Sequence, residues 1–117
     1  MNHETRALTL LLSLLATSGA WAADNMHQHQ AMTPAQQSYQ HGMTAMHDKM
    51  MDGLKAQDAD VAFAQGMIAH HQGAIEMAKT ELQYGKDPAM QKLAREIIAA
   101  QQPEIDKMQA WLKTRQP

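Results

Sequence analysis

A series of helix-start signals constrains this 117-residue sequence more than any other feature. Thr33 is suited to cap a helix that begins at Pro34, because proline is favoured in the first turn. Gln36 lies at the spacing that completes a capping box with Thr33. A first helix is therefore predicted from here to about Gly53. No segment alternates with period two, and no β-branched run lies between hairpin turns, which argues against a sheet. The sequence predicts an all-α fold.

Two further helices follow the same rules. Asp58 or Asp60 suits the start of a second helix, because either side chain can cap the helix and its negative charge interacts favourably with the helix dipole. Gly85 suits the end of this helix. Asp87 then caps a third helix that Pro88 opens. Two turn segments thus separate three predicted helices.

The third helix carries a proline in its interior. Pro103 is expected to kink this helix or to split it near Gln102. Connections of about 2 to 8 residues make neighbouring helices antiparallel. We therefore expect a small antiparallel bundle of three to four helices that runs up, down and up, with the third helix closing over the other two.

The first 23 residues have the pattern of a secretory signal peptide. Arg6 precedes an apolar core over 7–16, and the small-residue site Ala20-Trp21-Ala22 predicts cleavage after Ala22 or Ala23. That core is too short for a bilayer span, which needs roughly 20 residues, so the chain is not expected to span a membrane. A periplasmic or secreted protein is predicted.

The remaining chain is expected to form one domain. Residues 24–32 are polar and aperiodic, as in a flexible tail, and 33–117 hold the helices. The formal net charge is −2 and no Lys/Arg cluster occurs, so nucleic acid is not an expected partner. The absence of cysteine excludes a disulfide framework and a thiolate metal site.

The apolar residues of the segment 24–53 are unusual. It contains no Leu, Ile, Val, Phe or Trp, yet it has six methionines and four histidines, whereas the rest of the chain uses branched aliphatic residues freely. Methionine sulfur suits Cu(I), and imidazole suits copper in either oxidation state. The sequence therefore predicts copper binding, with silver as a candidate competitor, in preference to zinc, which has little use for thioethers.

Helical-wheel positions give the candidate ligands, since residues three or four apart on a helix are neighbours. On the first helix the predicted buried face is formed by Tyr39, Met43, Met46, His47, Met50 and Leu54, with Met51 at its edge. On the second helix the corresponding face is formed by Phe63, Met67, His70, His71, Ala74, Met77 and Ala78. The proposed metal ligands among these are Met43, Met46, His47, Met50, Met67, His70 and His71.

Two alternatives stay open for these residues. A methionine stripe at helical spacing is also what an ordinary core has. His70 and His71 point about 100° apart, so we do not expect both to bind one ion. Met51 and Met77, together with Met26, His27 and His29 of the tail, are accessory candidates only.

The third helix offers polar partners to a buried histidine. Gln101 and Glu104 lie on the arc that holds the apolar residues of that helix, so both are expected to point inward. A carboxylate or amide that binds the second ring nitrogen fixes the tautomer of a ligand histidine. Alternatively, Glu104 satisfies a purely structural histidine.

The segment 60–78 resembles a known bacterial family. It reads D-x-x-F followed by M-I-x-H-H-x-x-A-x-x-M, with His70-His71 as the histidine pair, and it is similar to the domain of unknown function 305 family. The similarity extends upstream to Met43 and downstream to Leu112. Two departures are Ala69, where members often have proline, and Pro103 between Gln101 and Glu104.

This resemblance implies a ferritin-like packing of the helices. Some exported members, of the CopM type, bind copper and support copper resistance. By resemblance, the Met/His residues proposed above form the metal region, and the protein buffers or sequesters copper in the cell envelope, where other copper-handling proteins are candidate partners.

Two other classes of function compete with copper binding. A Met-rich helical surface can also serve as a non-catalytic interaction module, for a partner helix or a second copy of the chain in a homodimer. An enzyme is not expected, because the Glu-x-x-His pairs of di-iron centres and the common nucleophile and phosphate motifs do not occur in the sequence.

Overall fold

The computed structural model describes residues 30–115, where three helices follow one another and no strand occurs. They are α1 (Pro34–Gly53), α2 (Ala59–Tyr84) and α3 (Pro88–Lys113), which confirms the all-α prediction. None of these three helices is both long enough and apolar enough to cross a membrane. The predicted signal peptide lies outside the described residues.

Local capping chemistry sets the helix ends where the sequence predicted them. The Thr33 hydroxyl accepts a hydrogen bond from the Gln36 amide at 3.1 Å, and the Gln36 side chain accepts one from the Thr33 amide at 2.9 Å, which completes the capping box. The carboxylates of Asp58 and Asp87 each accept a hydrogen bond at 3.0 Å from the backbone amide three residues later. Gly85 ends α2. Each cap satisfies amide groups that the helix itself leaves unpaired.

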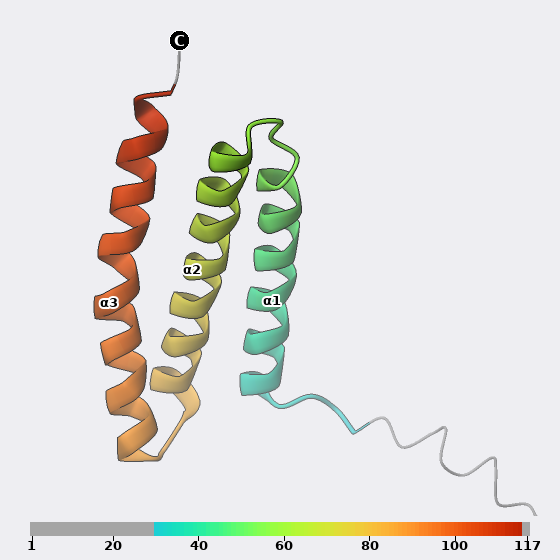
Figure 1. Ribbon diagram of the computed structural model, residues 1–117. Helices are drawn as coiled ribbons and strands as arrows, with labels where there is room; N and C mark the ends of the chain where they lie inside the picture. The colour runs from blue at the N-terminus through green and yellow to red at the C-terminus, as the bar shows by residue number, and fades with distance from the viewer. Residues whose placement is uncertain (1–29, 116–117) are drawn as a thin grey trace, which may run out of the picture. The chain divides into compact units, whose positions relative to one another are not determined.

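The three helices lie side by side, with α2 between α1 and α3 (Figure 1). Both outer helices pack along α2, but within the described residues no Cα atom of α1 comes within 8 Å of one in α3. The prediction that the third helix closes over the other two is therefore wrong. Because α2 offers two opposite contact sides, each outer helix takes one of them and the layer stays open.

The interior proline does not divide α3. The helix is continuous from Pro88 to Lys113 through Pro103, so of the two predicted alternatives, a kink or a split near Gln102, the split does not occur. Pro103 and Ala99, whose carbonyl loses its helical partner at the proline, are both exposed. Water can therefore bind the carbonyl that the proline leaves free.

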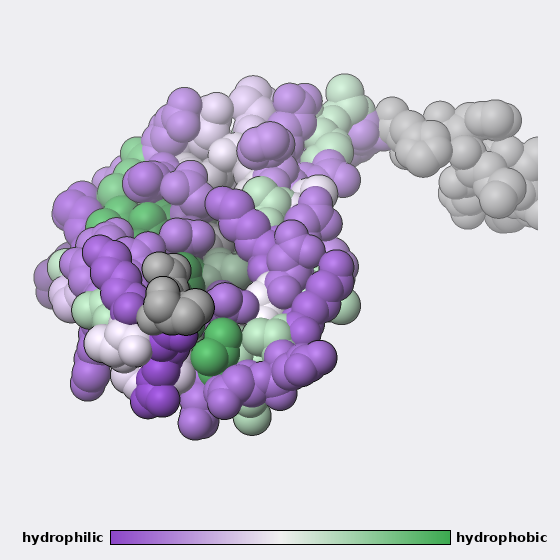
Figure 2. Space-filling model, turned by 90° about the horizontal axis from the view of Figure 1, so that it is seen from above, coloured by the Kyte–Doolittle hydropathy of each residue, from purple (hydrophilic) through white to green (hydrophobic). Residues whose placement is uncertain are grey.

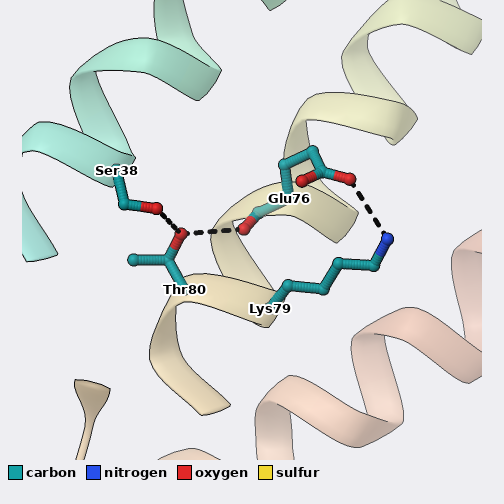
Figure 3. Close-up of polar contacts among 4 residues, drawn as sticks. All are labelled: Ser38, Glu76, Lys79 and Thr80. Carbon is teal, nitrogen blue, oxygen red and sulfur yellow. Dashed lines mark hydrogen bonds and ion pairs between the residues drawn. The ribbon is translucent and has the colours of Figure 1, made fainter. Parts of the chain in front are cut away.

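Small residues let α1 approach α2 closely. A Cβ atom placed on Gly73 would collide with the Met46 sulfur, and one on Gly53 would lie 2.9 Å from the carbonyl carbon of Gln65. At the other end of this interface, the Ser38 and Thr80 hydroxyls share a hydrogen bond of 2.7 Å (Figure 3). From one of these contacts to the next, the residue numbers rise along α1 and fall along α2. The two helices are therefore antiparallel, and these contacts fix their register.

Small side chains also line the contact between α2 and α3. The residues buried there or beside it include Ala64, Ala78, Ala94 and Ile105. None of the described residues combines a large side chain with complete burial. The core is therefore thin, as expected of a single layer of helices.

Two alanine substitutions test the glycine contacts of α1. Gly53→Ala should destabilise the fold by about 1–3 kcal/mol, because the new Cβ meets rigid backbone of α2. Gly42→Ala is the matched control: its Cβ would meet only the Glu76 Cβ at 3.8 Å, an ordinary contact, so the higher helix propensity of alanine should stabilise the fold by up to about 1 kcal/mol. Urea unfolding measures both values, and equal stability of the two variants would contradict the proposed close approach.

Candidate metal centre

The flat arrangement leaves both sides of the helical layer uncovered; one carries a more polar groove lined by His41, Glu76 and Thr80, and the other is mainly apolar. A groove of about 330 Å³ opens on the apolar side, lined by Tyr39 of α1, Met77 of α2 and Leu93 of α3 among others. A second groove of about 400 Å³, between Phe63 and Trp111, follows on the same side nearer the start of α2. We call this side the open face. Its apolar and histidine residues, by contact or by helical spacing, are Tyr39, Met43, Met50, Phe63, Met67, His70, Met77, Met90, Leu93, Ile97, Met108 and Trp111.

Met43 and Met50 of the methionine stripe of α1 lie on this open face instead of in a core, whereas Met46 packs against Gly73 of α2. Met43 is 46% exposed and His47 is exposed, whereas Met46 and Met50 are half-buried. The prediction that the whole stripe, with Leu54 and Met51, is the buried face is therefore wrong. The side of α1 that contacts α2 includes Met46 but is turned away from Met43 and His47, and no third helix covers α1.

The same correction applies to part of α2. Phe63, at 64%, and Met77, at 46%, are exposed, as is His70, although all were predicted to be buried. His71 and Ala78, by contrast, are buried against α3 as predicted. The two histidine rings point in different directions, with ring centroids 6.2 Å apart and planes at 64°.

His71 pairs with Glu104 of α3. Its Nε2 atom and the Glu104 carboxylate form a hydrogen bond between α2 and α3. The imidazole is almost completely buried, while the Glu104 side chain is 65% exposed and reaches the ring from the solvent side. A carboxylate can only accept, so in the neutral imidazole the Nε2 atom carries the proton and Nδ1 has the free lone pair.

The Nδ1 atom of His71 is buried and has no hydrogen-bond partner in the described part of the chain. The Oε1 atom of Gln101, on the same helix as Glu104, is in the same situation. An unsatisfied buried polar atom costs about 1–3 kcal/mol, so a native protein seldom retains one without a role. A bound metal ion would satisfy an imidazole lone pair of this kind.

The helix register brings several predicted ligands to one level. Because Met46 contacts Gly73, Met50 lies one turn further along α1, level with the part of α2 that carries Met67 and His70. Met67 is also one turn before His71 on α2, at the spacing where two side chains can share an ion.

Other predicted ligands lie apart from this group. His47 projects from the outer edge of α1, Met51 lies on the side of α1 remote from α2, and Met77 is two turns beyond His70. Within residues 30–115 no group of three His, Cys, Asp or Glu side chains is placed to hold a metal ion. Met26, His27 and His29 lie outside the described residues.

Gly73 is the residue of this site that the sequence reasoning did not identify. It receives the Met46 side chain and so fixes the methionine stripe against α2. The available signal was the seven-residue spacing of the small residues Gly66, Gly73 and Thr80, which puts them on one side of α2.

Comparison with known families agrees with the resemblance noted from the histidine pair. The family model described as "Domain of unknown function (DUF305)" matches residues 2–112. The chain belongs to the DUF305 family. The match includes both histidines of α2, the methionine stripe of α1 and the carboxylate of α3 that binds His71.

A relative outside bacteria shares part of this DUF305 sequence. An uncharacterized protein of Acanthamoeba polyphaga mimivirus is 43% identical over 56 residues, which are 48% of this chain and 37% of the viral protein. The chain thus spans well under half the length of that relative, whose name assigns no function.

The His71 contact can be tested by removing its partner. Glu104→Ala should destabilise the metal-free fold by about 1–2 kcal/mol, because it leaves a buried ring N–H without its acceptor. Glu96→Ala is the control, since within residues 30–115 Glu96 pairs only with exposed Lys92, and its loss should change stability by less than about 0.5 kcal/mol. If urea unfolding gives the same value for both variants, the His71 contact does not stabilise the fold.

Proposed function

We propose that this DUF305 protein binds copper on its open face and thereby buffers or sequesters the metal. His71 supplies an imidazole nitrogen, Met67 and the methionines of α1 supply sulfur, and His70, whose ring points in another direction, offers a nitrogen donor at the surface. Binding by ligand exchange, without catalysis, is the activity proposed. An exported protein of this kind would lower free Cu(I) and Cu(II) in the cell envelope and contribute to copper tolerance.

The buried, unpartnered Nδ1 atom of His71 is the observation that carries this proposal. A histidine that binds a metal through one ring nitrogen usually donates the other N–H to a carboxylate, which orients the ring and raises its basicity. Glu104 stands in that position at Nε2. The pair therefore has the arrangement of a ligand histidine with its orienting group.

The surrounding donors favour copper over other metals. The side chains level with His70 are methionines, and thioether sulfur suits Cu(I) far better than it suits Zn²⁺ or Mg²⁺. Silver has the same soft character and is expected to compete. The copper-handling proteins of the envelope would be the natural donors or acceptors of the ion.

A second candidate function is a non-catalytic interaction module without a physiological metal. The exposure of Phe63 and Met77 on the open face favours it, because contiguous exposed apolar surface is typical of interaction sites. The two functions differ in one respect: only the copper proposal gives a role to the free nitrogen of His71.

Replacing the methionine stripe tests the proposal directly. In an anaerobic Cu(I) competition titration against a chromogenic chelator, the wild type should take copper from the chelator, and the triple variant Met43→Leu, Met46→Leu, Met50→Leu should do so at least about tenfold less tightly. The control is the triple variant Met32→Leu, Met51→Leu, Met90→Leu, which removes as many sulfurs at positions that are not level with His70 on the open face. Wild-type protein that stays helical but takes no copper would support the interaction module instead.

Single substitutions test the role of the His71 pair. His71→Gln should abolish tight Cu(I) binding, and Glu104→Gln should weaken it by about 10- to 100-fold, the range found when an orienting partner of a ligand histidine is lost. His41→Gln, on an exposed part of α1, should leave affinity unchanged. Unaltered affinity in His71→Gln would exclude His71 as a ligand.

A further inference from the structure

Exposed apolar side chains concentrate at the two ends of the open face. Near one end lies the groove of Met77 and Leu93, and near the other Phe63 projects with 64% of its surface exposed. Phe63 and Met77 are fourteen residues apart on the same side of α2, which corresponds to about 21 Å. Viewed along the helices, apolar (green) surface reaches the outside between polar (purple) groups (Figure 2).

We propose that a second copy of this chain covers the open face, with its helices antiparallel to those of the first. The two-fold axis would cross the helices level with His70, which lies midway between Phe63 and Met77 in the sequence. Such a homodimer would supply the second layer of helices that the three-helix layer lacks.

The exposed area is adequate for this contact. Met43, Phe63, Met77, Met90 and Leu93 are each about half exposed, so together they present roughly 500 Å², near the upper limit for the largest apolar patch of a monomer. The half-buried residues of the same face, such as Met67 and Trp111, extend it toward the roughly 800 Å² per partner of a standard interface.

The shape of the open face favours an antiparallel pair. With the axis level with His70, Phe63 of each copy faces the groove beside Met77 of the other, and that groove, of about 330 Å³, has room for an aromatic ring. Because a two-fold contact is self-complementary, both Phe63 side chains are buried at once.

The charges at the two ends favour the same orientation. Glu81 lines the groove at one end, whereas Lys107 and Arg115 line the other together with Asp60. Antiparallel copies bring Glu81 of each toward the end that carries two basic residues and one acidic residue. A parallel pair would instead place the two Glu81 carboxylates at the same end, where they repel each other.

The dimer also brings the metal ligands of the two copies together. His70 is exposed in one chain, and the axis would place it beside His70 of the second copy, with Met67 of both copies close by. The sharing of copper between the two copies rests on the proposed copper function, whereas the dimer itself rests on the open face alone. Copper bound at His70 would then have donors from both chains.

Sedimentation equilibrium of the purified, metal-free protein tests the dimer. Wild type should sediment as a dimer, and Phe63→Asp should raise the dimer dissociation constant by about thirtyfold or more, as expected when an interface hot spot is lost. The control is Gln65→Asp, which adds the same charge two residues away on the opposite, polar side of α2 and should leave the dimer intact. Circular dichroism should show that both variants stay helical, because an acidic residue near the N-terminus of α2 interacts favourably with the helix dipole.

The outcomes separate this inference from the copper proposal. A wild type that is monomeric at all concentrations, or a Phe63→Asp variant that stays dimeric, would overturn the dimer whether or not copper binds. A dimer that the Phe63→Asp change dissociates supports the inference even if no copper binds, in which case the copper proposal alone fails. If both proposals hold, Phe63→Asp should also weaken Cu(I) binding by about tenfold, and Gln65→Asp should not.

Discussion

The contact of α2 with two partners on opposite sides determines the rest of this structure. On one side the glycines of α1 and α2 allow the two backbones to approach closely, and on the other side alanines and Ile105 pack between α2 and α3. With both sides of α2 occupied, α1 and α3 do not meet in the described part of the chain. The broad open face follows from this arrangement, and so does the small size of the core.

This arrangement also explains why the two adjacent histidines of α2 have different surroundings. One helical step separates the direction of α3 from that of the open face, so His71 is buried against Glu104 while His70 is exposed. The Glu104 contact directs one ring nitrogen of His71 outward and leaves the other buried without a partner. The chemistry of the site therefore depends on the packing of α2 against α3 and on the methionines that α1 holds alongside.

Local chemistry was predictable from the sequence, and long-range packing was only partly so. The helix ends follow from caps such as Thr33 and Asp87, whose hydrogen bonds span three residues and need no tertiary context. The partnership of a buried histidine with Glu104 also followed from helical spacing. Helical-wheel positions do not show whether a further helix covers Met43 and Phe63, because an apolar stripe has the same sequence pattern in an interior and on an open face. The continuity of α3 at Pro103 depends on the exposure of that turn, which the sequence alone does not determine.

The proposed role of His71 is most directly tested by nitrogen NMR of protein with ¹⁵N-labelled histidine, before and after anaerobic addition of Cu(I), which is diamagnetic. In the metal-free protein His71 should carry its proton on Nε2, and added Cu(I) should shift its Nδ1 resonance while leaving that of His41 unchanged. A His71 Nδ1 resonance that does not respond while copper binds would contradict the proposed role of this histidine. If copper does not bind at all, the metal-centre interpretation of the open face is wrong.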